Sequence, residues 1–201
     1  MLLAINSDNP QKRLIKKTVE ILRDGGIIVY PTDTVYGMGC DLFNKRGIEK
    51  IYEIKRRSMK QPFSFICADL KDISNYAIVS NYAYKTMRRM LPGPYTFILE
   101  ATRLVPKILL TKRKTVGIRV PDNEICLSIV RELGNPIIST SVTTGDEILS
   151  DPAEIEKKCG RAVDLVIDGG ILATEKSSVV RLVNDVPEII RMGKGDVSLF
   201  Q

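Results

Sequence analysis

Short apolar runs alternate with segments of helical periodicity along most of this chain, and that alternation sets its fold class. The first helical segment carries apolar side chains at helical spacing, at Leu14, Ile15, Val19 and Leu22. It stops at Gly25-Gly26, and the apolar run 27–30 that follows reads as a buried strand. This alternation predicts an α/β fold in which helices cover a sheet, and we expect one domain over residues 1–201.

Caps and breakers mark where the expected elements begin and end. Asn9 reads as the cap of the first helix, with Pro10 at its first position, and Asn44 reads as the cap of the second. Further helices are expected over residues 82–90, 123–133 and 151–159, the last opened by Asp151-Pro152. Strands are expected over residues 27–30, 63–68, 95–101, 115–120, 136–140, 165–167, 179–183 and 188–191. Residues 32–41 read as a loop, and the last two strands read as a hairpin, which places the antiparallel pairs toward the end.

Composition bounds the cellular setting. The chain is 44% hydrophobic and can bury one substantial core, yet no apolar stretch approaches the roughly 18 to 20 residues that span a bilayer. Its first residues lack the basic segment and long apolar region of a signal peptide, so we expect a cytoplasmic protein without a membrane segment. No Cys-x-x-Cys pair suggests a zinc or redox site, and we expect reduced, buried thiols at Cys40, Cys67, Cys126 and Cys159.

The chain contains no histidine, which excludes Ser-His-Asp and Cys-His triads and removes the commonest general base. Its 30 Lys and Arg residues against 24 Asp and Glu residues give a net charge of +6. This balance favours partners that bear phosphate, such as a nucleotide or RNA. The sequence gives no indication of an oligomeric state.

The stretch Pro31-Thr32-Asp33-Thr34-Val35-Tyr36-Gly37-Met38-Gly39 places two hydroxyls, a carboxylate and two glycines directly after the buried strand 27–30. Ligands in open α/β sheets bind outside the carboxyl ends of strands, so a polar cluster there is a candidate site. The alternative is an ordinary turn, with Pro31 as its breaker and Asp33 as a local cap.

Six further segments recur with this stretch in a characteristic order. They are Lys55-Arg56-Arg57 followed by Pro62-Phe63, Pro92-Gly93-Pro94-Tyr95-Thr96, Gly117-Ile118-Arg119-Val120-Pro121, Ser139-Thr140-Ser141, Ser177-Ser178-Val179-Val180 and Ile190-Arg191-Met192-Gly193. Over essentially the whole chain, their order and spacing resemble the YrdC/TsaC family of L-threonylcarbamoyladenylate synthases. Residues 7–11, Thr140-Ser141 and 195–197 are most similar to its YciO branch. The resemblance implies a YrdC/RibB-like fold, a twisted open mixed sheet flanked by helices with a basic concave cleft.

The resemblance also implies a reaction. Members of the family condense L-threonine, bicarbonate and ATP to threonylcarbamoyl-adenylate and pyrophosphate, for a tRNA modification at adenosine 37. Two anions meet when a carbamate oxygen attacks the α-phosphorus, so cationic side chains and Mg²⁺ must offset their repulsion. We therefore expect Mg²⁺ to enter with ATP, and we assign no metal ligands within the chain.

Site residues follow from the matching motifs. In the Lys-x-Arg motif, Lys55 and Arg57 are expected to act catalytically on the phosphates. The expected threonine contacts are Thr34, Arg119, Ser139 and Ser177, with Arg119 holding the carboxylate through two parallel hydrogen bonds. The expected nucleotide contacts are Lys55, Arg57, Gln61, Ser141, Thr143 and Arg191. The alternatives are a solvated basic helix end at residues 55–57, solvent-facing arginines at 119 and 191, and ordinary turn serines.

Two departures from the family pattern affect the nucleotide side. Ser58 and Gln61 replace a proline and a lysine or asparagine that usually follow the Lys-x-Arg motif. The Ser-x-Asn loop, usually Ser-Ala-Asn followed by Ser-Gly, becomes Ser141-Val142-Thr143-Thr144-Gly145, which is one residue shorter. In it a hydroxyl replaces an amide that both donates and accepts. These departures suggest an attenuated enzyme.

They also keep a second hypothesis open, a YciO-type protein that binds double-stranded RNA or tRNA and has weak or lost adenylation activity. Its phosphate contacts would come from one groove lined by basic side chains. These are Lys55, Arg56, Arg57, Lys60, Lys85, Arg88, Arg89, Lys112, Arg113 and Lys114. A related nucleotidyl transfer with another amine or carboxylate is a third hypothesis.

Overall fold

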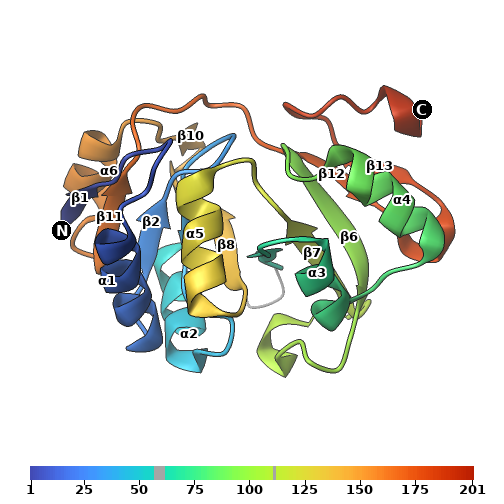
Figure 1. Cartoon of the computed structure of the whole chain (residues 1–201), viewed down its shortest axis with the longest axis horizontal. Coiled ribbons are helices and arrows are strands. Elements are labelled where there is room, and N and C mark those ends of the chain that lie inside the picture. The colour runs from blue at the N-terminus through green and yellow to red at the C-terminus, as the bar shows by residue number, and fades with distance from the viewer. Residues whose placement is uncertain (57–61, 111) are drawn as a thin grey trace.

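A twisted mixed sheet crosses the whole domain in the computed structural model (Figure 1). The structure describes residues 1–56, 62–110 and 112–201, and within them the sheet has 11 strands. In spatial order they are β1 (Leu2–Ala4), β11 (Leu165–Asp168), β2 (Ile28–Tyr30), β3 (Gly37–Gly39), β8 (Ile137–Ser141), β4 (Ser64–Ile66), β7 (Thr115–Arg119), β6 (Tyr95–Ala101), β12 (Ser178–Arg181) and β13 (Glu188–Arg191), with β5 (Ala77–Ile78) paired to β6. A separate hairpin joins β9 (Thr143–Thr144) to β10 (Glu147–Ile148). The expected α/β fold is confirmed.

Helices cover both faces of the sheet. They are α1 (Lys12–Arg23), α2 (Lys45–Ile54), α3 (Leu70–Tyr76), α4 (Asn81–Met90), α5 (Glu124–Leu133) and α6 (Pro152–Cys159), with short 3-10 turns η1 (Lys107–Leu109), η2 (Val183–Asp185) and η3 (Ser198–Phe200). Figure 1 shows α1 and α5 side by side over one half of the sheet and α3 and α4 over the other. Because side chains alternate along β2, Ile28 is buried in the cluster of α1 and α5, whereas Val29 is buried in the cluster of α2.

The expected side-chain caps at Asn44 and Asp151 are confirmed, and Asn123 is a further cap. Asn44 accepts a hydrogen bond from the backbone N–H of Gly47 at 2.8 Å, and Asn123 caps α5 in the same way. Asp151 caps α6, whose first residue is Pro152. These contacts satisfy N–H groups that a helix leaves without partners in its first turn.

The expected cap of the first helix is wrong. The helix begins at Lys12, and neither Asn9 nor Pro10 lies within it. The Asn6 side chain accepts hydrogen bonds from the N–H groups of Asp8 and Asn9, at 3.0 and 2.8 Å. This local turn uses the backbone that the helix would have needed, so α1 starts after it.

The interpretation of residues 32–41 as a loop is also wrong in part. Gly37–Gly39 forms β3, which pairs antiparallel with β2 on one side and with β8 on the other. Antiparallel pairs therefore occur near the start of the chain as well as in the confirmed β12–β13 hairpin. A strand of two glycines and one methionine has no propensity signal, because its pairing depends on distant strands. The elements β1, α3, β5, β9 and β10 also lie outside the sequence-based expectations.

The alternation along β7 separates a core face from an open face. Val116 and Ile118 are buried in the cluster that contains Ile73 of α3 and Met87 of α4. Gly117 and Arg119 point to the other face of the sheet, where they line a cavity. The fold thus leaves one side of β4, β7, β6 and β12 uncovered by α3 and α4.

Cys40, Cys67 and Cys126 are buried free thiols, as expected, and Cys159 is half-buried. Burial raises the pKa of Cys40 to about 12 and also raises that of Cys67 and Cys126. These three thiols therefore stay protonated at neutral pH and are structural. Among the described residues, no helix combines the length and apolar character that a bilayer crossing requires.

Candidate functional site

The cavity on the open face of the sheet has a volume of about 470 Å³. Small-molecule sites commonly occupy about 300 to 1,000 Å³, so a nucleotide-sized ligand fits this range. Its walls are Pro62, Phe63, Ser64, Ile66, Thr96, Ile98, Thr115, Gly117, Arg119, Ser139, Thr140, Ser141, Thr143, Gly145, Asp146, Lys176, Ser177, Val179 and Arg191. Three cations and one carboxylate are among these residues, which agrees with the expected basic concave cleft.

Sheet register explains why residues distant in sequence share this cavity. Ser64 of β4 lies opposite Ser139 of β8 on one side and Gly117 of β7 on the other. A Cβ added at Gly117 would lie 3.2 Å from Ser64 Oγ. The absence of a side chain at Gly117 therefore leaves space in the cavity above β7. One row further along, Ile66 lies opposite Arg119.

Arg119 is buried at one end of the cavity, and the motif after β2 is folded around it. Its Nη2 donates to Thr34 Oγ1 at 2.6 Å and to Thr32 Oγ1 at 3.2 Å. The same nitrogen forms an ion pair with Asp33, in which each side chain is 9% exposed. Asp33 is therefore the partner of Arg119, and not the cap of a simple turn. The requirement that a buried arginine be paired accounts for this arrangement.

Two atoms of this pair keep unused hydrogen-bonding capacity. Asp33 Oδ2 and Arg119 Nε are buried and have no hydrogen-bond partner among the described residues. Because Nη2 is already engaged by the chain, a ligand carboxylate has to share the guanidinium with Asp33. The two parallel hydrogen bonds expected from Arg119 to the substrate carboxylate stay a prediction.

Arg191 stands at the rim of the same cavity and is partly exposed. Its Nε and Nη2 donate to the carbonyl oxygen of Ser177, at 3.0 and 2.8 Å. The Ser177 hydroxyl lies 2.9 Å from that of Thr96 and accepts a further bond from Arg191 at 3.2 Å. Partial burial and then the charge of Arg119 lower the pKa of Arg191. Arg119 and Arg191 therefore both place positive charge at the cavity, which favours an anionic ligand between them.

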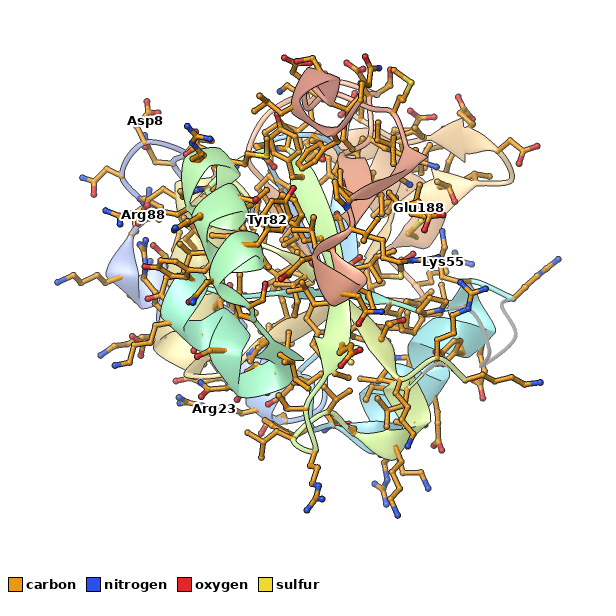
Figure 2. The ribbon with its side chains drawn as sticks, turned by 90° about the vertical axis from the view of Figure 1, so that its right-hand side faces the viewer. Asp8, Arg23, Lys55, Tyr82, Arg88 and Glu188 are labelled. Carbon is orange, nitrogen blue, oxygen red and sulfur yellow. The ribbon has the colours of Figure 1, made fainter. Side chains whose placement is uncertain are left out.

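Lys55, labelled in Figure 2, follows the last turn of α2. Its side chain contacts the loop that begins at Ser141. Its Nζ donates to the carbonyl oxygen of Ser141 at 3.1 Å and to the Thr143 hydroxyl at 2.8 Å. The hydroxyl that stands where the family has an amide therefore accepts from Lys55. In this structure Lys55 supports the cavity wall at Ser141 and Thr143.

The expected site residues are brought together only in part. The walls include Arg119, Ser139, Ser141, Thr143, Ser177 and Arg191. Thr34 is buried behind Arg119, and Lys55 lies behind the loop at Thr143. The expectations for Arg57 and Gln61 lie outside the described residues.

Sequence reasoning missed Lys176 and the pairing role of Asp33. Lys176 lines the cavity directly before Ser177, but nothing in its sequence context separates it from a surface lysine. Asp33 lies inside the recognised motif, and its partner is 86 residues away. The signal that could have identified Asp33 is that an arginine in a buried strand needs a carboxylate partner.

The cavity walls fit a Mg²⁺ ion that enters bound to the phosphates of a nucleotide. Asp146 is the one carboxylate among the described cavity walls. Mg²⁺ in nucleotide sites is held largely by substrate phosphates and water, with one or two carboxylates from the protein. Within residues 1–56, 62–110 and 112–201, no group of three or more Cys, Asp or Glu side chains could hold a metal by itself.

Comparisons with known proteins agree with this geometry. The family model Sua5/YciO/YrdC, which carries the description "telomere recombination", matches residues 20–193. The uncharacterized protein YciO of Escherichia coli K12 is 45% identical over 199 residues, which cover 98% of this chain and 97% of YciO. A threonylcarbamoyl-AMP synthase of Vibrio vulnificus is 27% identical over 171 residues, which cover 83% of this chain and 92% of the synthase.

Two solved structures share the fold. The crystal structure of E. coli YciO superposes with a TM-score of 0.96 at 43% identity, covering 100% of this chain and 99% of that one. Sua5 of P. abyssi, crystallised with L-threonine, superposes with a TM-score of 0.90 at 24% identity. That match covers 96% of this chain and 57% of the Sua5 chain.

Proposed function

The chain belongs to the Sua5/YciO/YrdC family, and from that premise we propose that it is a nucleotidyltransferase of the threonylcarbamoyl-AMP synthase type. It would condense L-threonine, bicarbonate and ATP to threonylcarbamoyl-AMP and pyrophosphate, for the threonylcarbamoyl modification of tRNA. One observation carries the proposal: a hydroxyl-lined cavity holds Arg119 at its buried end and Arg191 with Lys176 at its rim.

The reaction needs cations more than it needs a protein nucleophile. The threonine amine attacks bicarbonate, and water leaves to give a carbamate. A carbamate oxygen then forms a bond to the α-phosphorus of ATP while the bond to the β-phosphate oxygen breaks, and pyrophosphate leaves with the electron pair. Side chains that hold both anions close together and absorb the charge on pyrophosphate account for catalysis of this kind. A chain without histidine can supply all of them.

In this proposal each substrate has its own partners in the cavity. Arg119 would hold the threonine carboxylate together with Ser139, while Thr34 fixes the guanidinium from behind. The P. abyssi relative was crystallised with L-threonine and has the same fold, which supports threonine as the amino acid substrate. Arg191 and Lys176 at the rim would then face the phosphates.

The loop at Ser141 and Thr143 would border the nucleotide, and Lys55 fixes that loop through Thr143. Bound Mg²⁺ would supply further charge compensation on the phosphates, with Asp146 as the nearby carboxylate. Arg57 and Gln61 remain proposed nucleotide contacts on the family motif alone.

The experiment that tests this function measures pyrophosphate release from ATP and Mg²⁺ with bicarbonate, in the presence and absence of L-threonine. We expect release that depends on threonine and is slower than in a synthase with an intact Ser-x-Asn loop. A rate that threonine does not change would refute the proposal.

RNA binding is the second candidate, and α4 is the observation that favours it. This helix has no acidic residue, and Lys85, Arg88 and Arg89 form no ion pair within the described part of the chain. Tyr82 and Tyr84 of the same helix are also exposed, and Figure 2 labels Tyr82 and Arg88 on it. Cations bind phosphates, and aromatic rings stack on unpaired bases.

The structure separates this surface from the cavity. Ala83 and Met87 attach α4 to the core face of β6, opposite the open face. The single basic groove expected from Lys55 and the cations of α4 is therefore wrong. Replacing Arg88 and Arg89 with alanine should weaken RNA binding and its salt dependence without changing pyrophosphate release.

A further inference from the structure

Tyr30 is a buried tyrosine whose hydroxyl reaches the wall of the cavity. Its side chain is 0% exposed, and its hydroxyl donates to Ser139 Oγ at 2.6 Å. Tyr30 belongs to β2 and Ser139 to β8, and β3 lies between these two strands. The tyrosine ring therefore crosses a whole strand to make this contact.

The glycines of β3 make this crossing possible. A Cβ at Gly37 would lie 2.8 to 2.9 Å from the Cζ, Cε2 and hydroxyl oxygen of Tyr30. A Cβ at Gly39 would lie 3.3 Å from Cε1 of the same ring and 2.0 Å from the carbonyl oxygen of Ile138. Because Gly37 and Gly39 have no side chains, the Tyr30 ring has room to lie across β3. Their role here is packing, and no phosphate contact is needed to explain them.

The bond fixes how the Ser139 hydroxyl can be used. Burial raises the pKa of Tyr30 well above its ordinary value, so the phenol remains protonated and acts as the donor. A serine hydroxyl has one proton and two lone pairs, and Tyr30 occupies one lone pair. The Ser139 proton is then directed away from Tyr30, and Ser139 lines the cavity. Ser139 is in this way prepared to donate to an acceptor inside the cavity.

The position of the pair identifies the end of the cavity that it serves. Tyr30 stands two residues before Thr32, whose hydroxyl accepts from Arg119 Nη2 at 3.2 Å, and Ser139 and Arg119 line the same cavity, so the two hydroxyls lie at the Arg119 end. Since Asp33 already engages Nη2 of Arg119, a ligand carboxylate there shares the guanidinium with Asp33, and a second donor beside it would strengthen binding. The Ser139 hydroxyl is suited to supply it.

We propose that Tyr30 is a positioning residue that orients the Ser139 hydroxyl as a hydrogen-bond donor to the carboxylate of the amino acid substrate. This inference rests on the proposed function, because it takes its substrate class from there. Tyr30 does not touch the substrate; it acts through Ser139, and the glycines of β3 give its ring room.

The test compares Tyr30→Phe, Ser139→Ala and the double variant, in pyrophosphate release and in calorimetric titration with L-threonine. Tyr30→Phe should raise the KM and the Kd for threonine about tenfold, since a hydrogen bond to a charged group is lost or misdirected. The KM for ATP should change less than about twofold, because no phosphate contact is altered. The double variant should resemble Ser139→Ala alone, since both changes remove one interaction.

Tyr36→Phe is the matched control. Tyr36 is equally buried, and its hydroxyl bonds to the backbone of Gly170 at 2.7 Å and of Gly169 at 3.2 Å. Tyr36→Phe removes a phenolic oxygen, as Tyr30→Phe does, so a general effect of that loss on stability would appear in both variants. Urea unfolding of each variant separates weak binding from loss of the fold.

Each outcome decides the proposal. Unchanged threonine affinity in Tyr30→Phe, an equal rise in the KM for ATP, or additive effects in the double variant would overturn the role of Tyr30 while leaving the proposed function intact. A parent protein that binds threonine without turnover, and binds it more weakly as Tyr30→Phe, would refute the proposed function and support the positioning role. A parent that binds no threonine would refute both.

Discussion

Arg119→Ala should destabilise the fold as well as weaken threonine binding, because the substitution leaves Asp33 as a buried, uncompensated charge. Both side chains of the pair are only 9% exposed. Breaking a buried ion pair by removing one partner costs about 3 to 5 kcal/mol. Domains of this size are stable by about 5 to 15 kcal/mol, so the variant should stay folded in dilute buffer with a much lower urea midpoint.

The pair of Arg131 and Glu124 offers a matched control on the same chain. Its side chains are 53% and 45% exposed, and exposed pairs of this kind contribute about 0 to 1 kcal/mol. Arg131→Ala should therefore unfold close to the parent midpoint. Combining Arg119→Ala with Asp33→Asn should recover part of the lost stability, since the unpaired charge is gone.

Urea unfolding followed by circular dichroism measures all four proteins at a common pH and salt concentration. Equal midpoints for Arg119→Ala and Arg131→Ala would refute the reasoning, because Arg119 would then hold no buried charge. No recovery on adding Asp33→Asn would contradict the assignment of Asp33 as its partner.

Three further predictions concern the loop and the thiols. Lys55→Ala should slow adenylate formation while leaving the calorimetric Kd for threonine nearly unchanged, since Lys55 fixes the loop through Thr143. Replacing Thr143 with Asn and inserting one residue before Gly145 should raise threonine-dependent ATP turnover, because an amide can accept from Lys55 and still donate to the nucleotide; an unchanged rate would count against an attenuated synthase. The free energy of unfolding should fall between pH 9 and 10.5: burial raises the pKa of Cys40 from 9.0 to about 12, so the folded chain keeps a proton that the unfolded chain releases. Urea titrations at both pH values check this, and Cys40→Ser should reduce the slope.

Features encoded within a few residues could be predicted from the sequence. The caps at Asn44 and Asp151 depend on a side chain and an N–H group two or three residues away, and both are confirmed. The segment 95–101 is a strand as expected, because Tyr95, Phe97 and Leu99 pack on one core while the residues between them face the other side of the sheet. Such signals are local and need no knowledge of the fold.

Features set by distant pairing could not be predicted. The strand Gly37–Gly39 exists because β2 and β8 lie on either side of it, and its own composition argues for a turn. Asp33 reads as a turn residue until the sheet brings Arg119 beside it. The hydroxyl of Tyr30 reaches Ser139 only because the intervening strand consists largely of glycine. Propensity describes the segment alone, whereas these contacts are decided by tertiary structure.

Detection of the adenylate itself tests the central claim most directly. The protein is incubated with ATP, Mg²⁺, L-threonine and bicarbonate labelled with carbon-13, and the products are analysed by mass spectrometry. The proposed function predicts threonylcarbamoyl-AMP that carries the label, formed only when threonine is present and strongly reduced by Arg191→Ala. An adenylate that lacks the label, or the absence of any threonine-dependent adenylate, would contradict it.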